Sequence, residues 1–379
     1  MFIRKIILLF LLITSQNSFS EGLVFECDET NLKRIEVQLE QYFNKLKIEK
    51  HFFHKEIQKN SIQFNLKNNS PDTSTLYIRW EPKYKIEDEI VYLPTSTGHK
   101  EVLTVSKKEI LLALMQSGRN TIFSGQSCDF EAFEDHLLVR QMIVAWAENL
   151  HWKFPDGGNA QWNQSYWKDG TLKPDKPLLE AMTDFFINPD QCSVGCYTAT
   201  KIVIIQGVLD YYQRIKKDSA KANEVKKLLR SDGEVLVNIE PDAMWHFLKK
   251  DQPEIKSKNG KLLSVKHNIA PLNFIPGDWV YFINTDPASS DKPGYEGSNS
   301  IYMGRAKFDD FYNDNGHYFF YHEKLLEVYN WRHGVFSRSN DYDKLQPLSS
   351  DLLNSLGLSP QKGGLVLDSR SVPKYFGFE

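Results

Sequence analysis

One cysteine in this sequence has the surroundings that nucleophilic chemistry requires. Cys196 follows Gly195 and opens an apolar stretch, residues 197–212, whose apolar side chains recur at helical spacing. A thiol at the start of a helix faces unpaired backbone N–H groups and the positive end of the helix dipole, and both favour the thiolate. The pattern therefore predicts that Cys196 is a nucleophile near neutral pH. The alternative is an inert core thiol, because cysteine is among the most buried residue types.

The N-terminus has the pattern of a secretory signal peptide. Arg4 and Lys5 are followed by an apolar run over 6–13 and by a small-x-small site at Ser18-Phe19-Ser20. The apolar run is far shorter than the roughly 20 residues that span a membrane. We therefore expect residues 1–20 to be removed. The mature chain is expected to be secreted or periplasmic, with no stable membrane insertion after signal cleavage.

Composition excludes several classes of partner. The 379-residue chain has a net charge of −3 and no basic excess, so nothing indicates binding to nucleic acid. No Walker or Rossmann glycine pattern is present. His51 and His54 share a helical spacing but lack a third ligand at a zinc-binding distance in the sequence. The sequence thus predicts no metal and no cofactor.

Four cysteines allow three disulfide pairings, and spacing does not choose among them. An oxidising compartment permits disulfides. If Cys196 is a free nucleophile, a bridge between Cys27 and Cys128 is the natural pairing. Cys192 then stays unpaired or closes reversibly on Cys196. A structural Cys192–Cys196 bridge is the competing alternative.

The hydrophobic pattern divides the chain into an N-terminal α+β module over 21–125, a catalytic domain over 126–346 and a C-terminal tail over 347–379. A helix that begins with a cysteine and packs on later antiparallel strands is the papain-like arrangement, so the predicted fold class is α+β with a papain-like catalytic domain. Helices are expected over 28–47, 110–116, 129–152, 174–187, 196–212 and 219–229. Strands are expected over 61–66, 75–80, 89–93, 276–282, 297–304 and 315–321.

The segment 154–170 is rich in glycine, asparagine and aromatic residues. Such a loop is suited to line a substrate groove, because aromatic side chains offer rigid contact area. We therefore predict that Trp162 and Trp167 bind substrate. A surface loop held in place by buried tryptophans is an equally good interpretation.

Four segments, taken in order, resemble one family of enzymes. They are NQSYW at 163–167, CYTAT at 196–200, PGDWVYFIN at 276–284 and YEGSNSIYMG at 295–304. Over roughly residues 129–335 the sequence resembles the spore-coat type of bacterial protein-glutamine γ-glutamyltransferase. More distantly, it resembles the NlpC/P60 cell-wall hydrolases.

The resemblance implies a cysteine that attacks a glutamine carboxamide, releases ammonia and passes the acyl group to a lysine amine. It places this nucleophile on Cys196. The family also has an acidic residue directly before the cysteine and another after the glycine of a Trp-Gln-Gly-Glu-Asn run. These positions hold Gly195 and Ser298 here, so both carboxylates are absent.

Two residues are candidates to replace the absent acids. Glu296 precedes Ser298 by two positions, and strand alternation places both on one face. His317 lies at the start of the strand predicted over 315–321 and matches a family histidine near that place. Imidazole is the usual partner of a thiolate. The alternatives are an exposed turn acid and a solvent-exposed loop histidine. Asn299, in the same segment as Glu296, is predicted to bind substrate.

The sequence leaves three functional hypotheses. The first is a secreted, cysteine-dependent transglutaminase that cross-links protein glutamine and lysine side chains through a thioester. The second is an NlpC/P60-like amidase or endopeptidase that acts on peptidoglycan peptides with water as the acceptor. The third is a secreted binding protein that kept the fold and lost the catalytic acids.

Overall fold

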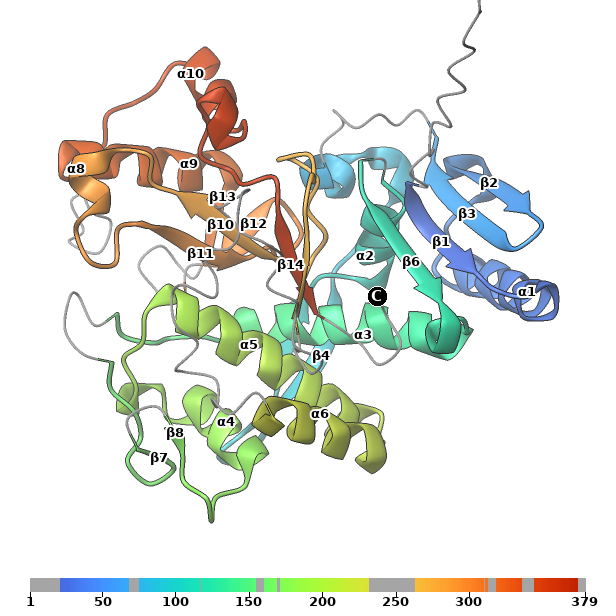
Figure 1. The fold of residues 1–379 in the computed structure, drawn as a ribbon, viewed down its shortest axis with the longest axis horizontal. Helices are drawn as coiled ribbons and strands as arrows, with labels where there is room; N and C mark the ends of the chain where they lie inside the picture. The colour runs from blue at the N-terminus through green and yellow to red at the C-terminus, as the bar shows by residue number, and fades with distance from the viewer. Residues whose placement is uncertain are drawn as a thin grey trace, which may run out of the picture.

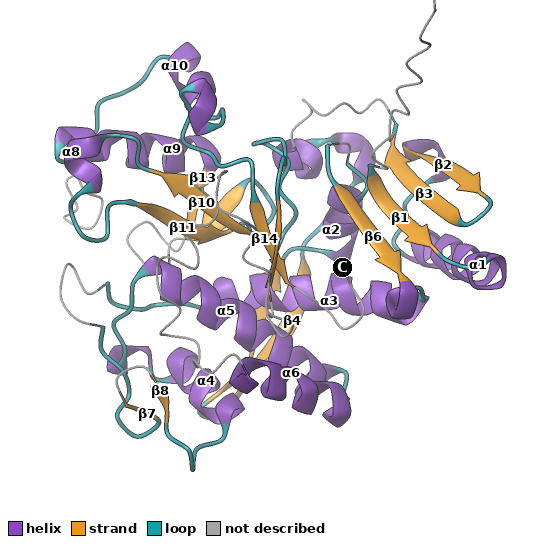
Figure 2. Cartoon of the chain, viewed as in Figure 1, coloured by secondary structure: helices purple, strands orange, loops and turns teal. Residues whose placement is uncertain are grey.

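The protein is described by a computed structural model. The residues that it describes are 21–67, 75–116, 118–154, 160–168, 171–231, 263–309, 311–312, 318–335 and 344–373. Two predictions, the signal peptide over 1–20 and the role of His317, therefore lie outside the described residues. In the described part of the chain, the two largest sheets, of four strands each, are joined by long helices (Figure 1). Figure 2 shows this mixture of helices and sheets, which confirms the α+β class.

The N-terminal sheet consists, in spatial order, of β2 (Phe53–Gln58), β3 (Ser61–Leu66), β1 (Gly22–Glu26) and β6 (Asn120–Ser124). β1 pairs antiparallel with β3 and parallel with β6. Helix α1 (Glu29–Lys45) packs on β3 through an apolar stripe that includes Leu32, Ile35 and Leu39. Asp28 caps this helix, because its side chain accepts from the Asn31 N–H at 3.0 Å.

A hairpin of β4 (Glu89–Thr95) and β5 (Gly98–Thr104) leads into α2 (Lys107–Leu114). Ser106 caps this helix, because its side chain accepts the Glu109 backbone N–H at 3.2 Å. The strand predicted over 75–80 is wrong. Thr75–Trp80 is a 3₁₀ helix that contacts α2 and buries Leu76 and Ile78, so tertiary packing overrides the strand propensity of these residues.

Two buried helices cross the centre of the molecule. α3 (Phe130–Ala147) and α5 (Cys196–Asp210) pack closely, because Gly207 lets the backbones approach: a Cβ at this position would lie 2.6 Å from Cγ1 of Ile143. After α5 comes a π-helical turn, Tyr211–Ile215. The neighbouring helices are α4 (Leu178–Ile187) and α6 (Ser219–Ser231).

The second sheet consists, in spatial order, of β11 (Gly297–Ile301), β10 (Trp279–Ile283), β14 (Arg370–Pro373) and β9 (Leu263–Lys266). Its pairs are all antiparallel. β14 comes from the segment predicted as a tail, so the described part of that segment belongs to the fold. The strand predicted over 315–321 forms in part as β13 (Tyr318–Phe320), but it pairs with β12 (Lys307–Asp309) in a separate ribbon. The remaining elements are β7 (Trp167–Lys168), β8 (Thr171–Leu172), α8 (Pro287–Ser290), α9 (Tyr321–Asn330) and α10 (Ser350–Leu356).

One hydrophobic core crosses the boundary predicted near residue 125. It runs from Phe25 in the N-terminal sheet, through α3 and α5, to Trp279 and Ile301 in the second sheet. A second cluster, which includes Phe282 and Phe308, packs the sheet against α9. The domain boundary itself stays a prediction. Among the described residues, no helix combines the length and the apolar character needed to cross a membrane.

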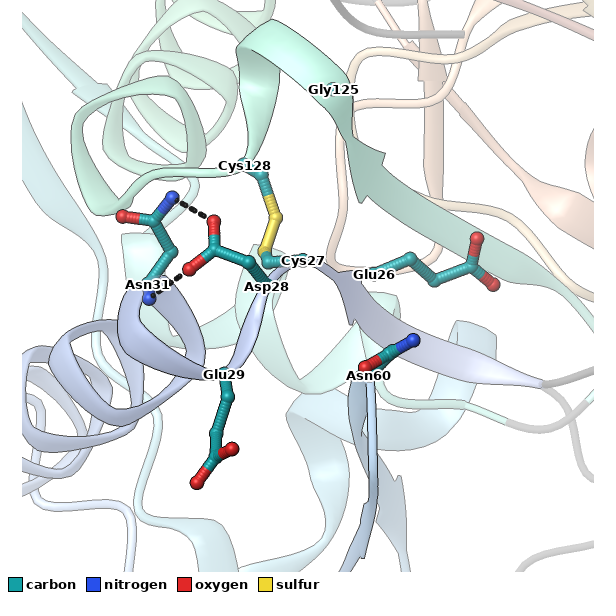
Figure 3. Close-up of a pocket in the computed structure, with 8 residues that line it drawn as sticks. All are labelled: Glu26, Cys27, Asp28, Glu29, Asn31, Asn60, Gly125 and Cys128. Carbon is teal, nitrogen blue, oxygen red and sulfur yellow. Dashed lines mark hydrogen bonds between the residues drawn. A yellow bond between two sulfur atoms is a disulfide. The ribbon is translucent and has the colours of Figure 1, made fainter.

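A disulfide joins Cys27 to Cys128, with their Cα atoms 5.9 Å apart, and Cys192 and Cys196 are free thiols. The pairing predicted for a free Cys196 is therefore confirmed. The bridge connects the end of β1 to the residue before the N-cap of α3. It lies beside a shallow cavity of about 520 Å³ whose wall also includes Glu26, Asp28 and Glu29. Figure 3 shows these residues around the bridge. This cavity lies at the N-terminal sheet.

Candidate active site

The turn before Cys196 is held by backbone bonds to other segments. The Ser193 N–H donates to the Gln161 carbonyl at 3.0 Å, and the Gln161 N–H donates back at 2.8 Å. The Tyr312 hydroxyl donates to the Val194 carbonyl at 2.8 Å. These bonds set where α5 begins.

Gly195 is the N-cap of α5 and offers no side-chain cap. The first N–H groups of a helix have no partner within it. The positive end of α5 is therefore able to stabilise a negative charge that develops near Cys196. A Cβ built on Gly195 meets nothing within 4 Å. The absence of the acidic side chain that the family has at this position therefore leaves open space beside the cysteine.

Asn299 contacts the Cys196 thiol through two donors. Its backbone N–H donates to Sγ at 3.5 Å and its side-chain Nδ2 donates to Sγ at 3.4 Å. β11 is an edge strand, so an N–H of Asn299 is free to donate outside the sheet. Two N–H donors therefore converge on one sulfur atom. Cys196 is half-buried, whereas the other free cysteine, Cys192, is buried.

Aromatic residues surround this contact. The indole Nε1 of Trp279 donates to Oδ1 of Asn299 at 3.0 Å. The ring of Tyr197 lies 5.4 Å from that of Trp279, and the Lys201 ammonium lies 4.3 Å from the centre of the Tyr197 ring. Trp279 and Asn299 are both buried, and a hydrogen bond in such surroundings is stronger than in water.

Tyr281 stands opposite Asn299 in the pairing of β10 with β11. A Cβ on Gly297 would lie 2.4 Å from the Tyr281 hydroxyl, so only glycine fits beneath this ring. Burial raises the pKa of Tyr281 well above its ordinary value, and the charges of Cys196 and Glu296 add to the shift. The phenol is therefore neutral at physiological pH.

The second free cysteine has different surroundings. Cys192 is 1% exposed, and burial raises the pKa of its thiol to about 12. It lies before the turn rather than at the helix start, and the hydrogen bond that it receives from the Asn163 backbone does not offset the effect of burial on its pKa. Of the two free thiols, only Cys196 has the exposure and the contacts of a nucleophile.

Ser298, at one of the two positions where the family has an acid, lies on the other face of the sheet from Asn299. It is buried and pairs with Phe282, and successive side chains of a strand point to opposite faces. Glu296 is exposed, and its carboxylate accepts the Gly294 N–H at 2.9 Å. Strand alternation thus places Glu296 on the same face as Ser298. The residue that contacts the Cys196 thiol is Asn299, on the other face. The role of Glu296 stays a prediction.

The two tryptophans predicted to bind substrate lie in the core. Trp167 is 0% exposed and Trp162 is 8% exposed, and both rings pack against Phe185. This burial corresponds to the alternative interpretation, a loop held by buried tryptophans. Trp162 and Trp167 thus offer little surface to a substrate, because the packing that fixes the loop uses their rings.

Sequence reasoning missed the role of Trp279. The residue lies in one of the segments that carried the family resemblance, but its contact with Asn299 depends on the pairing of β10 with β11. Asn299 itself was predicted, although as a substrate-binding residue. Within the described residues, no group of three or more His, Cys, Asp or Glu side chains is placed to hold a metal ion.

A half-buried thiol at a helix start, with two N–H donors from a facing strand, is suited to nucleophilic chemistry at sulfur. A family model described as protein-glutamine gamma-glutamyltransferase matches residues 85–330. The chain belongs to this family of acyltransferases, as its sequence motifs predicted. The match begins well before residue 129, so it includes part of the predicted N-terminal module.

Comparison with solved structures finds a transglutaminase from Geobacillus stearothermophilus, without its C-terminal extension. The similarity has a TM-score of 0.40 and a sequence identity of 17%, and it covers 64% of this chain and 92% of that chain. Comparison with curated proteins gives no match.

Proposed function

We propose that this chain is an exported transglutaminase in which Cys196 forms the thioester. The observation that carries the proposal is the donation of two Asn299 N–H groups to a thiol at the start of α5. Family membership supports the substrate class, the side chains of protein glutamine and lysine. The helix α5 packs on the edge of an antiparallel sheet, which supports a papain-like arrangement of the site.

The reaction that we propose proceeds in two steps. The Cys196 thiolate attacks the carbonyl carbon of a glutamine carboxamide, the C–N bond breaks, and the amide nitrogen leaves as ammonia after taking up one proton. A lysine amine then attacks the thioester, loses one proton and forms an isopeptide bond, while the thiolate leaves. N–H groups at the start of α5 and on Asn299 are suited to stabilise the oxyanion of each tetrahedral intermediate.

Each step needs a group that carries protons. His317 and Glu296 are our candidates, because an imidazole or a carboxylate takes up and returns a proton at neutral pH. Gly195 and Ser298 occupy the positions of the family acids and cannot serve. The effects of His317→Ala and Glu296→Ala on turnover will separate the two candidates.

Export is supported by the pattern over residues 1–20 and by the Cys27–Cys128 disulfide, which suits an oxidising compartment. Expression of the full chain, followed by N-terminal sequencing of the protein outside the cytoplasm, tests this part. A mature N-terminus near Glu21 is expected. Retention of residues 1–20 on a cytoplasmic product would overturn it.

Activity is tested by ammonia release and by incorporation of a fluorescent primary amine into a glutamine-rich protein, with wild type and Cys196→Ala under mild reductant. We expect incorporation by wild type and a loss of at least about 10³-fold in the variant, since removal of a covalent nucleophile typically costs this much or more. Ammonia release without incorporation would indicate a hydrolase with water as acceptor. Absence of both activities would overturn the transglutaminase proposal, and release of soluble peptides from purified cell wall would then distinguish a peptidoglycan hydrolase from a binding protein.

A further inference from the structure

The carboxamide of Asn299 is bonded at both ends. Its Oδ1 accepts the Trp279 Nε1–H at 3.0 Å, and its Nδ2 donates to Cys196 Sγ at 3.4 Å. The oxygen and nitrogen of an amide exchange places when the group flips, so its orientation depends on its partners. An indole N–H donates and never accepts. The Trp279 ring is therefore satisfied only when Oδ1 faces it, and Nδ2 then faces the sulfur.

We propose that Trp279 is a positioning residue for Cys196: its indole N–H holds the Asn299 carboxamide in the orientation that donates to sulfur. The flipped amide would place its NH₂ against the indole N–H and its oxygen against the sulfur. Two donors would then face each other, and a carbonyl dipole would oppose a thiolate. The inference rests on the proposed function only in taking Cys196 as the reactive thiol.

Trp279 is itself held firmly. Its side chain is 3% exposed and packs against the Tyr197 ring. Its backbone follows Asp278, whose carboxylate is bound by the buried guanidiniums of Arg119 and Arg140. A chain of fixed contacts therefore runs from these buried charges through Trp279 and Asn299 to the sulfur. A site arranged in this way has its donors in place before substrate arrives.

The test is the pH profile of Cys196 alkylation by iodoacetamide, followed by peptide mapping, in folded protein without substrate. Asn299→Ala removes one donor and is expected to move the midpoint of the profile to higher pH. Trp279→Phe keeps an aromatic ring but loses the N–H, and we expect a smaller shift in the same direction. In the double variant the shift should equal that of Asn299→Ala alone, because a residue that acts through Asn299 has no effect once the amide is absent.

Trp331→Phe is the matched control. Trp331 is equally buried, at 1% exposed, and its Nε1 has no hydrogen-bond partner within the described part of the chain. This variant measures the general cost of replacing a core indole, and its alkylation profile should match wild type. An unshifted profile for Trp279→Phe would overturn the proposal. So would an equal shift by Trp279→Phe with and without the Asn299 side chain.

Asn299→Asp keeps the proposal testable if Trp279→Phe does not fold. A carboxylate still accepts the indole N–H but places a second oxygen, rather than an N–H, toward the sulfur. The midpoint should therefore move up further than in Asn299→Ala, and an equal or smaller shift contradicts the role of the amide donor. Alkylation needs no glutamine substrate. If the alkylation profiles shift as predicted but no amine is incorporated, the proposed function is refuted and the positioning role of Trp279 is retained.

Discussion

Arg119 and Asp278 form a buried, bidentate ion pair across 159 positions of sequence. Arg119 lies just before β6 in the N-terminal sheet, and Asp278 lies just before β10 in the sheet that carries Asn299. Arg140 of α3 adds a second guanidinium at 2.9 Å. Although burial alone would raise the pKa of Asp278, the two guanidiniums hold it below its ordinary value, so the carboxylate stays ionised. The pair joins the two sheets through charge as well as through the common core.

Removal of this carboxylate is expected to destabilise the whole chain. Asp278→Ala leaves two guanidiniums buried without their counter-ion, which typically costs about 3–5 kcal/mol of unfolding free energy. Urea denaturation measures the loss. The control is Asp175→Ala, which removes an exposed partner of Lys176 and should change stability by less than about 0.5 kcal/mol. A loss below about 1 kcal/mol for Asp278→Ala would show that the pair is not structural.

Glu109 is expected to make stability fall as pH rises toward neutrality. Burial raises the pKa of this carboxyl from 4.5 to about 7. Between these values the folded state keeps a proton that the unfolded state has released. The folded state is therefore favoured at the acidic end of the window, and it loses up to roughly 3 kcal/mol as pH rises from 4.5 to 7.

Glu109→Gln provides the comparison for this prediction. Glutamine does not ionise but retains a side-chain oxygen that can accept the Arg305 backbone N–H, which Glu109 accepts at 2.6 Å. The variant should lack this part of the pH dependence in urea denaturation at pH 5, 6 and 7. Equal slopes of stability against pH in both proteins would contradict the assignment to Glu109.

The Cys27–Cys128 bridge should contribute about 3–5 kcal/mol, because it closes a loop of 101 residues in the unfolded chain. The cavity beside it gives a small reductant access to the bridge (Figure 3). We therefore expect dithiothreitol to lower the thermal midpoint of wild type to that of Cys27→Ser/Cys128→Ser. The double variant itself should not respond to the reductant. A response of both proteins would point to a different cause.

The two free thiols should differ in reactivity in the folded state. At pH 8, iodoacetamide should label Cys196 at least ~100-fold faster than Cys192, because burial raises the pKa of Cys192 to about 12 and removes access to it. Both should react at similar rates in guanidinium chloride. Peptide mapping by mass spectrometry distinguishes the two positions, and comparable labelling of both in the folded protein would contradict the structure.

The helices and the candidate nucleophile were predictable because their signals are local. Gly195 and the apolar periodicity after it place Cys196 at the start of α5, and Ser106 and Asp28 cap their helices within three residues. Order and spacing of four short motifs were enough to predict the family. Cys27–Cys128 was the natural bridge to expect if Cys196 is a free nucleophile, and the structure contains this bridge.

The contacts around the sulfur were decided by tertiary structure alone. Asn299 lies 103 positions from Cys196, and Trp279 reaches Asn299 only through the register of β10 with β11. The strand propensity of 75–80 yielded to packing on α2, and the end of the chain supplies β14 to the second sheet. Local sequence thus determines where helices begin and which thiol stands at a helix start. Pairing between distant segments determines what that thiol contacts, because register and burial depend on the whole chain.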